Sequence, residues 1–118
     1  MRIMRPHEKL DIWIKSVELS EKIYSIVAKF PKEEIYGLTS QIKRAVVSVP
    51  ANIAEGAARR TKTEFRQFLY VARGSLSEME TEIKIAVKLG YISEEKTAEI
   101  AVLSEEIGKK ITALIRKL

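Results

Sequence analysis

Apolar residues recur every three to four positions in four stretches of the chain, which is the spacing of amphipathic α-helices. The first predicted helix covers residues 10–30 and has a broad apolar face made of two neighbouring stripes. One stripe contains Leu10, Trp13, Val17, Tyr24 and Val27, and the other contains Ile12, Leu19, Ile23, Ile26 and Phe30. Pro31 ends this helix and suits the first turn of the next, where Glu33 and Glu34 favour the positive end of the helix dipole.

The second predicted helix covers residues 32–58, and its apolar stripe contains Leu38, Ile42, Ala45, Val49 and Ile53. Pro50 lies within this stripe. Because proline has no amide hydrogen, it leaves the carbonyl of Val46 without its usual helical donor and crowds that turn. The apolar stripe stays in phase beyond Pro50, so we expect a kink at this residue and not a break.

The third predicted helix begins at a capping box formed by Thr61 and Glu64 and ends at Gly90, which suits a left-handed cap. Its apolar stripe contains Phe65, Phe68, Leu69, Ala72, Leu76, Met79, Ile83 and Ala86. The fourth predicted helix begins after Ser93. Its stripe contains Ile100, Leu103, Ile107, Ile111, Leu114 and Leu118.

These four segments predict the fold class. No stretch alternates with a period of two, so β-strands are not expected. Long helices joined by short turns pack antiparallel, which predicts an all-α fold, an antiparallel up-down four-helix bundle with residues 1–118 as a single domain. Apolar residues make up 46% of the chain and charged residues 31%, a composition typical of a folded protein and not of a disordered or membrane-embedded chain.

The second predicted helix has two further faces besides its core face, which also includes Val46 and Gly56. One is a continuous polar stripe that contains Gln41, Arg44, Ser48, Asn52, Glu55 and Arg59. Its pairs of residues four positions apart are, in one interpretation, ordinary surface pairs that stabilise the helix slightly. In the other interpretation, Ser48 and Asn52 satisfy backbone groups loosened by Pro50, while Arg44 and Arg59 contact a partner.

The other face lies opposite the core and carries no charge. It contains Val47, Ala51, Ala54 and Ala58, and the third predicted helix similarly turns Tyr70, Gly74 and Ile85 away from its core stripe. Small uncharged residues allow another helix to approach closely, which favours a subunit interface between copies of the chain. The alternative is that alanine, the best helix former, simply lies on the surface.

The positive charge is concentrated in one part of the chain. The net charge is +5, and the window of residues 41–73 accounts for all of it, with seven basic residues against Glu55 and Glu64. The basic residues are Lys43, Arg44, Arg59, Arg60, Lys62, Arg66 and Arg73. Such a surface suits a polyanion such as RNA or DNA, although basic clusters on small helical proteins are often only solvated surface.

Residues for catalysis, metal binding or cofactor binding are not evident. The chain has no cysteine and one histidine, His7, and no glycine-rich phosphate loop. Glu78 and Glu82 are the closest carboxylate pair and are expected on a solvated helix face. We therefore expect no enzyme, no metal, no cofactor and no small-molecule substrate. With no membrane-spanning stretch and no secretory signal at the N-terminus, a cytoplasmic location is expected.

Several short motifs occur together in one order: Phe30-Pro31, Glu34, Tyr36-Gly37-Leu38, Gln41-Ile42-Lys43-Arg44-Ala45, Ser48-Val49-Pro50, Asn52-Ile53-Ala54-Glu55-Gly56 and Arg59. In these motifs the chain resembles the four-helix-bundle family named for proteins encoded in intervening sequences of bacterial 23S ribosomal RNA genes. The resemblance extends from the Trp13 region to the last helix. Lys43-Arg44 stands where the family usually has two arginines, and a lysine lacks bidentate phosphate contacts.

The resemblance implies a non-enzymatic bundle that assembles as a homopentamer. The family is also similar to the accessory protein of diversity-generating retroelements, a basic pentamer that binds nucleic acid and a reverse transcriptase. Two hypotheses follow. The first is a nucleic-acid-binding accessory protein that contacts phosphates. The second is a structural or protein-interaction module, with a reverse transcriptase as one candidate partner, in which the basic charge serves only solubility.

Overall fold

The computed structural model describes residues 5–118, and this part of the chain forms four α-helices and no β-strand. The α-helices are α1 (Asp11–Val27), α2 (Leu38–Ala57), α3 (Lys62–Lys88) and α4 (Ala98–Lys117). Short 3-10 helices precede three of them: η1 (Pro6–Lys9), η2 (Lys32–Glu34) and η3 (Glu95–Thr97). The all-α four-helix fold expected from the periodicity is confirmed.

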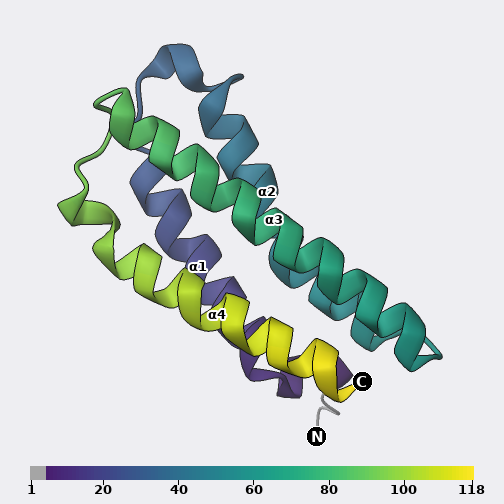
Figure 1. The fold of residues 1–118 in the computed structure, drawn as a ribbon. Coiled ribbons are helices and arrows are strands. Elements are labelled where there is room, and N and C mark those ends of the chain that lie inside the picture. The colour runs from purple at the N-terminus through teal and green to yellow at the C-terminus, as the bar shows by residue number, and fades with distance from the viewer. Residues whose placement is uncertain (1–4) are drawn as a thin grey trace, which may run out of the picture.

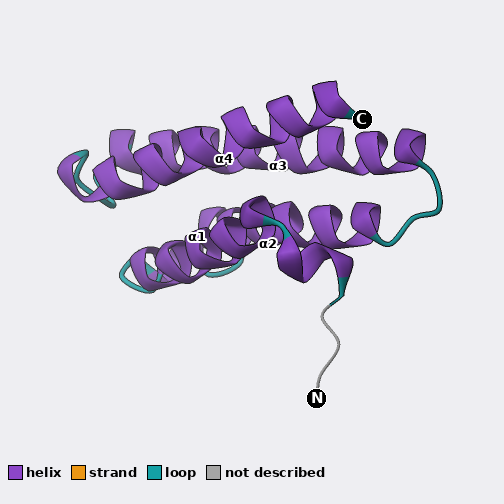
Figure 2. Ribbon diagram, turned by 90° about the horizontal axis from the view of Figure 1, so that it is seen from below, coloured by secondary structure: helices purple, strands orange, loops and turns teal. Residues whose placement is uncertain are grey.

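The helices pack in two layers. Figure 2 shows α3 beside α4 in one layer and α1 beside α2 in the other. Each helix packs mainly against two others, since α2 contacts α1 and α3, and α4 contacts α1 and α3. Consecutive helices run in opposite directions, so the α2–α3 turn and the C-terminus of α4 lie towards one end of the bundle, and the other two connections lie at the opposite end (Figure 1).

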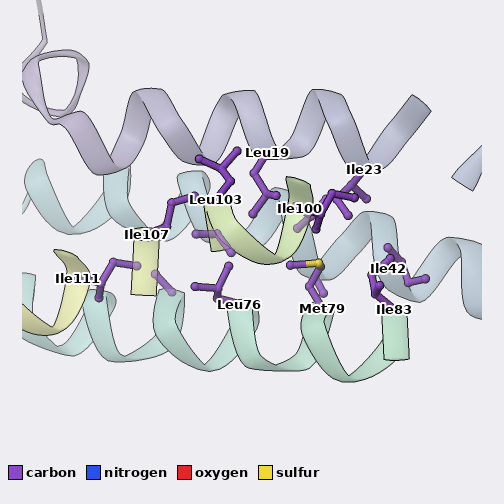
Figure 3. Packing of buried hydrophobic residues seen from close by; sticks show 14 of the residues in the cluster. Leu19, Ile23, Ile42, Leu76, Met79, Ile83, Ile100, Leu103, Ile107 and Ile111 are labelled. Carbon is purple, nitrogen blue, oxygen red and sulfur yellow. The ribbon is translucent and has the colours of Figure 1, made fainter. Parts of the chain in front are cut away.

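The space between the layers is filled by aliphatic side chains. Leu19 and Ile23 of α1 meet Leu76 and Met79 of α3 and Ile107 of α4, as Figure 3 shows. These side chains are almost fully buried. Burying a leucine or isoleucine side chain stabilises a fold by about 1.5 to 3 kcal/mol, so this shared core is what holds the four helices together.

The two stripes expected to be apolar core in the first helix are both buried only in part, since Ile26 of one stripe is partly buried and Val27 of the other is buried. Ile12, Leu19, Ile23 and Phe30 are buried, whereas Val17 is 40% exposed and Tyr24 is 43% exposed. The stripe containing Val17 and Tyr24 faces the edge of α2, where only part of each side chain is covered. In α4 the buried position in the last turn is Ile115, and Leu114 is only partly buried.

The start of α2 also differs from the prediction. Residues 32–34 form the separate helix η2, and α2 begins only at Leu38. Glu34 explains this start, because its Oε1 accepts a hydrogen bond from the Leu38 amide at 3.0 Å and its Oε2 accepts one from the Tyr91 hydroxyl at 2.8 Å. Both hydrogen bonds favour the ionised carboxylate and lower the pKa of Glu34.

The predicted ends of α3 are confirmed. Thr61 is the N-cap, its Oγ1 accepting from the Glu64 amide at 3.1 Å, and Gly90 adopts a φ of 79° just after the helix. Helix α2 continues through Pro50 without a break. The hydroxyl of Ser20 from α1 lies 3.4 Å from the Val46 carbonyl, the group that Pro50 leaves without an amide donor.

Candidate functional site

The α2–α3 turn places four of the predicted basic residues at one end of the bundle. Arg59, Arg60 and Lys62 are exposed, and Arg66 follows one turn into α3. Arg59 donates to Glu55 Oε1 at 2.9 Å, and its guanidinium carbon lies 4.8 Å from the centroid of the Phe68 ring. We call Arg59, Arg60, Lys62 and Arg66 the turn cluster.

The turn cluster is held on a short and well-capped connection. Helix α2 ends at Ala57, and the Ala58 amide bonds back to the carbonyls of Ala54 and Glu55. Helix α3 begins immediately after Thr61, whose hydroxyl and the Glu64 side chain lie 2.9 Å apart. The connection between the two helices is therefore only residues 58–61, and it is hydrogen-bonded to the helix end on each side.

Arg73 lies about two turns further along α3 than Arg66, where α3 contacts α4. Its Nη1 donates to Thr112 Oγ1 of α4 at 3.2 Å, and its guanidinium carbon lies 4.9 Å from the Tyr70 ring centroid. There it meets Lys109 and Arg116 in a groove between α3 and α4. Lys109 and Arg116 were not predicted as site residues, because only the axial register of two helices brings them beside Arg73.

Lys43 and Arg44 form a third group, in the first half of α2. Lys43 Nζ lies 4.9 Å above the Tyr24 ring of α1. Arg44 lies with Gln41, Ser48, Ser75 and Glu78 around a small hollow between α2 and α3. The seven predicted phosphate-binding residues therefore do not form one continuous patch.

The predicted polar stripe is split between solvent and a helix contact. Gln41, Arg44, Glu55 and Arg59 are exposed, while Ser48 and Asn52 are partly covered by α3. Ser48 Oγ and Ser75 Oγ lie 2.9 Å apart, and Asn52 Nδ2 donates to the Ser48 carbonyl at 2.8 Å and to Ser48 Oγ at 2.9 Å. This arrangement holds the middle of α2 against α3 beside Pro50.

The expectation that Glu82 lies on a solvated face is wrong. The residue is only 6% exposed, and its Oε1 is buried without a hydrogen-bond partner among residues 5–118. Burial raises the pKa of Glu82, and repulsion from Glu78 raises it further, against the opposing attraction of Arg44. Helical spacing alone places Glu78 and Glu82 on one face, but Glu82 turns towards α2 and Glu78 remains exposed.

The predicted small-residue face lies on the outside of α2. Val47, Ala51 and Ala58 are exposed, and Ala54 is partly buried. Tyr70 and Gly74 are exposed on α3, and a Cβ atom added to Gly74 would have no atom within 4 Å. The partly exposed Val17 and Tyr24 of α1 add apolar surface in the same layer as α2. These residues are accessible in a single copy of the chain.

Among residues 5–118 no group of three or more histidine, cysteine, aspartate and glutamate side chains is placed to hold a metal ion. His7 packs edge-on against Trp13, with ring centroids 4.9 Å apart. Within the same residues, no helix has the length and apolarity needed to cross a bilayer.

The fold and its basic end define a class of protein: a small antiparallel four-helix bundle with a capped, positively charged turn. A family model described as 23S rRNA-intervening sequence protein matches residues 8–113. The chain belongs to this family, as the motifs around Pro50 indicate.

One solved structure is similar over most of the chain. It is a crystal structure of a protein with unknown function from the S23 ribosomal protein family of Bacteroides thetaiotaomicron VPI-5482. It is 25% identical to this chain, covers 88% of this chain and 97% of its own, and superposes with a TM-score of 0.79. A comparison with curated proteins gives no match. Neither description names an enzymatic activity.

Proposed function

We propose that this protein is a non-enzymatic, nucleic-acid-binding accessory protein, and that the turn cluster contacts the phosphate backbone. The observation that carries this proposal is the arrangement of the turn cluster. Arg60 and Lys62 have no ion pair in the described part of the chain, and they stand exposed on a capped turn. Charges held in this way attract a polyanion without reading its base sequence.

Assembly would strengthen this binding. We propose that the chain forms a homo-oligomer, a pentamer as the resemblance to its family implies, through the face that contains Val47, Ala51, Ala54 and Ala58. Several copies of the turn cluster would then act on one nucleic acid, and linked sites raise the overall affinity. A reverse transcriptase is the protein partner that the same resemblance suggests.

Binding to nucleic acid is expected to be steeply salt-dependent and nearly independent of base sequence. Each phosphate contact releases counterions, so the logarithm of the affinity should fall linearly with the logarithm of salt concentration. Fluorescence anisotropy with labelled RNA and duplex DNA of several sequences across a salt series measures this. Arg59→Ala together with Arg60→Ala should flatten the slope. Negligible binding of the unmodified protein to both nucleic acids at low salt would contradict the proposal.

A protein-interaction module is the second candidate, favoured by the apolar surface of Val17, Tyr24 and Val47, each 40% exposed or more. In that case the outer face of α2 would dock a different protein, and the basic turn would serve solubility. The salt series separates the two candidates, because only the first requires the protein to bind nucleic acid. The oligomeric state also separates them, because the first candidate uses the outer face of α2 for contacts between copies of the chain.

Ala51→Glu is expected to dissociate the oligomer. Ala51 is exposed in the single chain, so the variant should fold, whereas a buried unpaired carboxylate in a subunit contact is strongly unfavourable. The matched control is Ala101→Glu, which makes the same change at an exposed position of α4 that does not face α2. Analytical ultracentrifugation of the three proteins reports the assembly. A monomeric unmodified protein would refute the interface.

A further inference from the structure

A shallow groove of about 500 Å³ lies between α3 and α4, on the half of these helices nearer the α2–α3 turn. Its lining includes Arg73 from α3 and Gly108, Lys109, Thr112 and Arg116 from α4. Gly108 permits close packing at this level, because a Cβ atom there would lie only 3.4 Å from Leu76 Cδ2.

The groove carries more positive than negative charge. Arg73 is oriented by Thr112 and by the Tyr70 ring, and it has no carboxylate partner within residues 5–118. Arg116 has no ion pair there either. Lys109 is paired with Glu105 at 3.1 Å, but both side chains are largely exposed, at 77% and 67%, so this pair is weak and screened. Three cations therefore face one carboxylate.

The edge of α3 beside this groove continues the row of cations. Lys62, Arg66 and Arg73 are four and seven residues apart, which places them on the same edge of the helix. They span about 16 Å at 1.5 Å per residue. Because α4 runs antiparallel and Thr112 lies level with Arg73, Arg116 lies one turn further towards Arg66. The row therefore joins the turn cluster to the groove.

The row ends where the α3–α4 surface becomes acidic. Beyond Lys109, the charged residues that line the next hollow between the two helices are Glu80, Glu94 and Glu105, against one cation, Lys84. Glu80 is fixed there by a hydrogen bond from the Ser104 hydroxyl at 2.6 Å. A polyanion would be attracted to one half of the α3–α4 surface and repelled from the other, so the row has a defined length and position.

Tyr70 stands beside the row with a partly exposed aromatic ring. Its side chain is 46% exposed, and the Arg73 guanidinium lies over the ring. An exposed ring next to phosphate-binding arginines is what single-strand binding sites use, because an unpaired base stacks on the ring while its phosphate meets the cation. A duplex keeps its bases stacked on one another and offers none to the ring.

We propose that the α3–α4 groove binds a single-stranded nucleic acid, with Lys62, Arg66, Arg73, Lys109 and Arg116 along its phosphates and Tyr70 stacking on a base. This inference rests on the proposed nucleic-acid binding but assigns it to a surface that the turn cluster alone does not include. The inference makes α4 part of the surface that binds nucleic acid.

The test compares variants with the same change in net charge. Arg73→Gln with Arg116→Gln removes two cations from the groove. Lys32→Gln with Lys96→Gln removes two exposed lysines at the opposite end of the bundle and is the control. Anisotropy with a labelled single-stranded oligonucleotide measures affinity across a salt series, and thermal unfolding confirms that each variant folds.

The groove variant should lose roughly five- to tenfold in affinity for each contact at 0.1 M salt, and its salt slope should fall by about two, while the control keeps the slope of the parent. Tyr70→Leu should leave the slope unchanged and reduce the preference for single strands over duplexes. Equal affinities of the groove variant and the control would overturn the inference. If Arg59→Ala with Arg60→Ala still weakened binding in that case, the proposed nucleic-acid binding through the turn cluster would stand. If the parent protein bound no nucleic acid, the proposed function and the groove site would both be wrong.

Discussion

Replacing Gly56 with leucine is expected to lower the free energy of unfolding by about 1 to 3 kcal/mol. Gly56 lies in the last turn of α2 and is buried against the first turns of α3. A Cβ atom at this position would lie 2.7 Å from Phe68 Cβ and 3.0 Å from Phe65 Cδ1. Neither phenylalanine can retreat easily, because the short capped turn keeps the two helix ends together. The helices would therefore have to separate or bend.

Alanine gives the sharpest comparison, because Gly74 offers a matched position in the interior of α3. Gly74→Ala adds a methyl group with no atom within 4 Å, so it should stabilise the fold by up to about 1 kcal/mol through helix propensity. Gly56→Ala, in the last turn of α2, receives at most the same propensity benefit but meets the clash, and its net effect should be destabilising. Urea unfolding followed by circular dichroism measures both. Stabilisation of equal size at the two positions would show that Gly56 has room for a side chain.

The helices could be predicted because their periodicity is a local property. The core face of α2, with Ile42, Val46, Val49 and Ile53, was identified from spacing alone, and all four residues are buried. Position on a helix does not reveal how far a neighbouring helix covers it. Val17 and Ile23 both lie on the broad apolar face of α1, yet only Ile23 is covered fully.

The parts of the candidate site that depend on contacts between helices could not be predicted. Arg73 and Thr112 are 39 residues apart, and their hydrogen bond depends on the axial register of α3 and α4. The beginning of α2 depends in the same way on Tyr91, which is 57 residues from Glu34. The basic window of residues 41–73 was visible as a run in the sequence, but its division into three groups and its extension to Arg116 follow only from packing.

Glu82→Gln is expected to raise the free energy of unfolding at pH 7, because the variant removes a negative charge that burial and the neighbouring Glu78 make unfavourable. The parent carboxylate is buried beside α2 with one oxygen unpaired, and the negative charge of Glu78 is close enough to raise the pKa of Glu82. Glutamine keeps the shape of the side chain and removes the charge. Glu18→Gln is the control, because it makes the same change at an exposed position of α1 and should change stability by less than about 0.5 kcal/mol.

The pH dependence distinguishes this cause from a change in packing. The pKa of Glu82 is raised in the folded protein above its ordinary value of 4.5, so the folded state binds the proton more tightly than the unfolded state. Protonation of Glu82 therefore stabilises the fold, and this contribution is complete below the ordinary value and lost as the pH rises through the folded pKa. Glutamine does not titrate, so the difference in the free energy of unfolding between the variant and the parent should be largest at pH 7 and should shrink towards pH 4.5. The depressed pKa of Glu34 acts in the opposite direction in both proteins and cancels in the difference. Urea unfolding of both proteins from pH 4 to pH 8 measures the difference in their free energies of unfolding. If this difference does not change with pH, burial of the charge is not the cause.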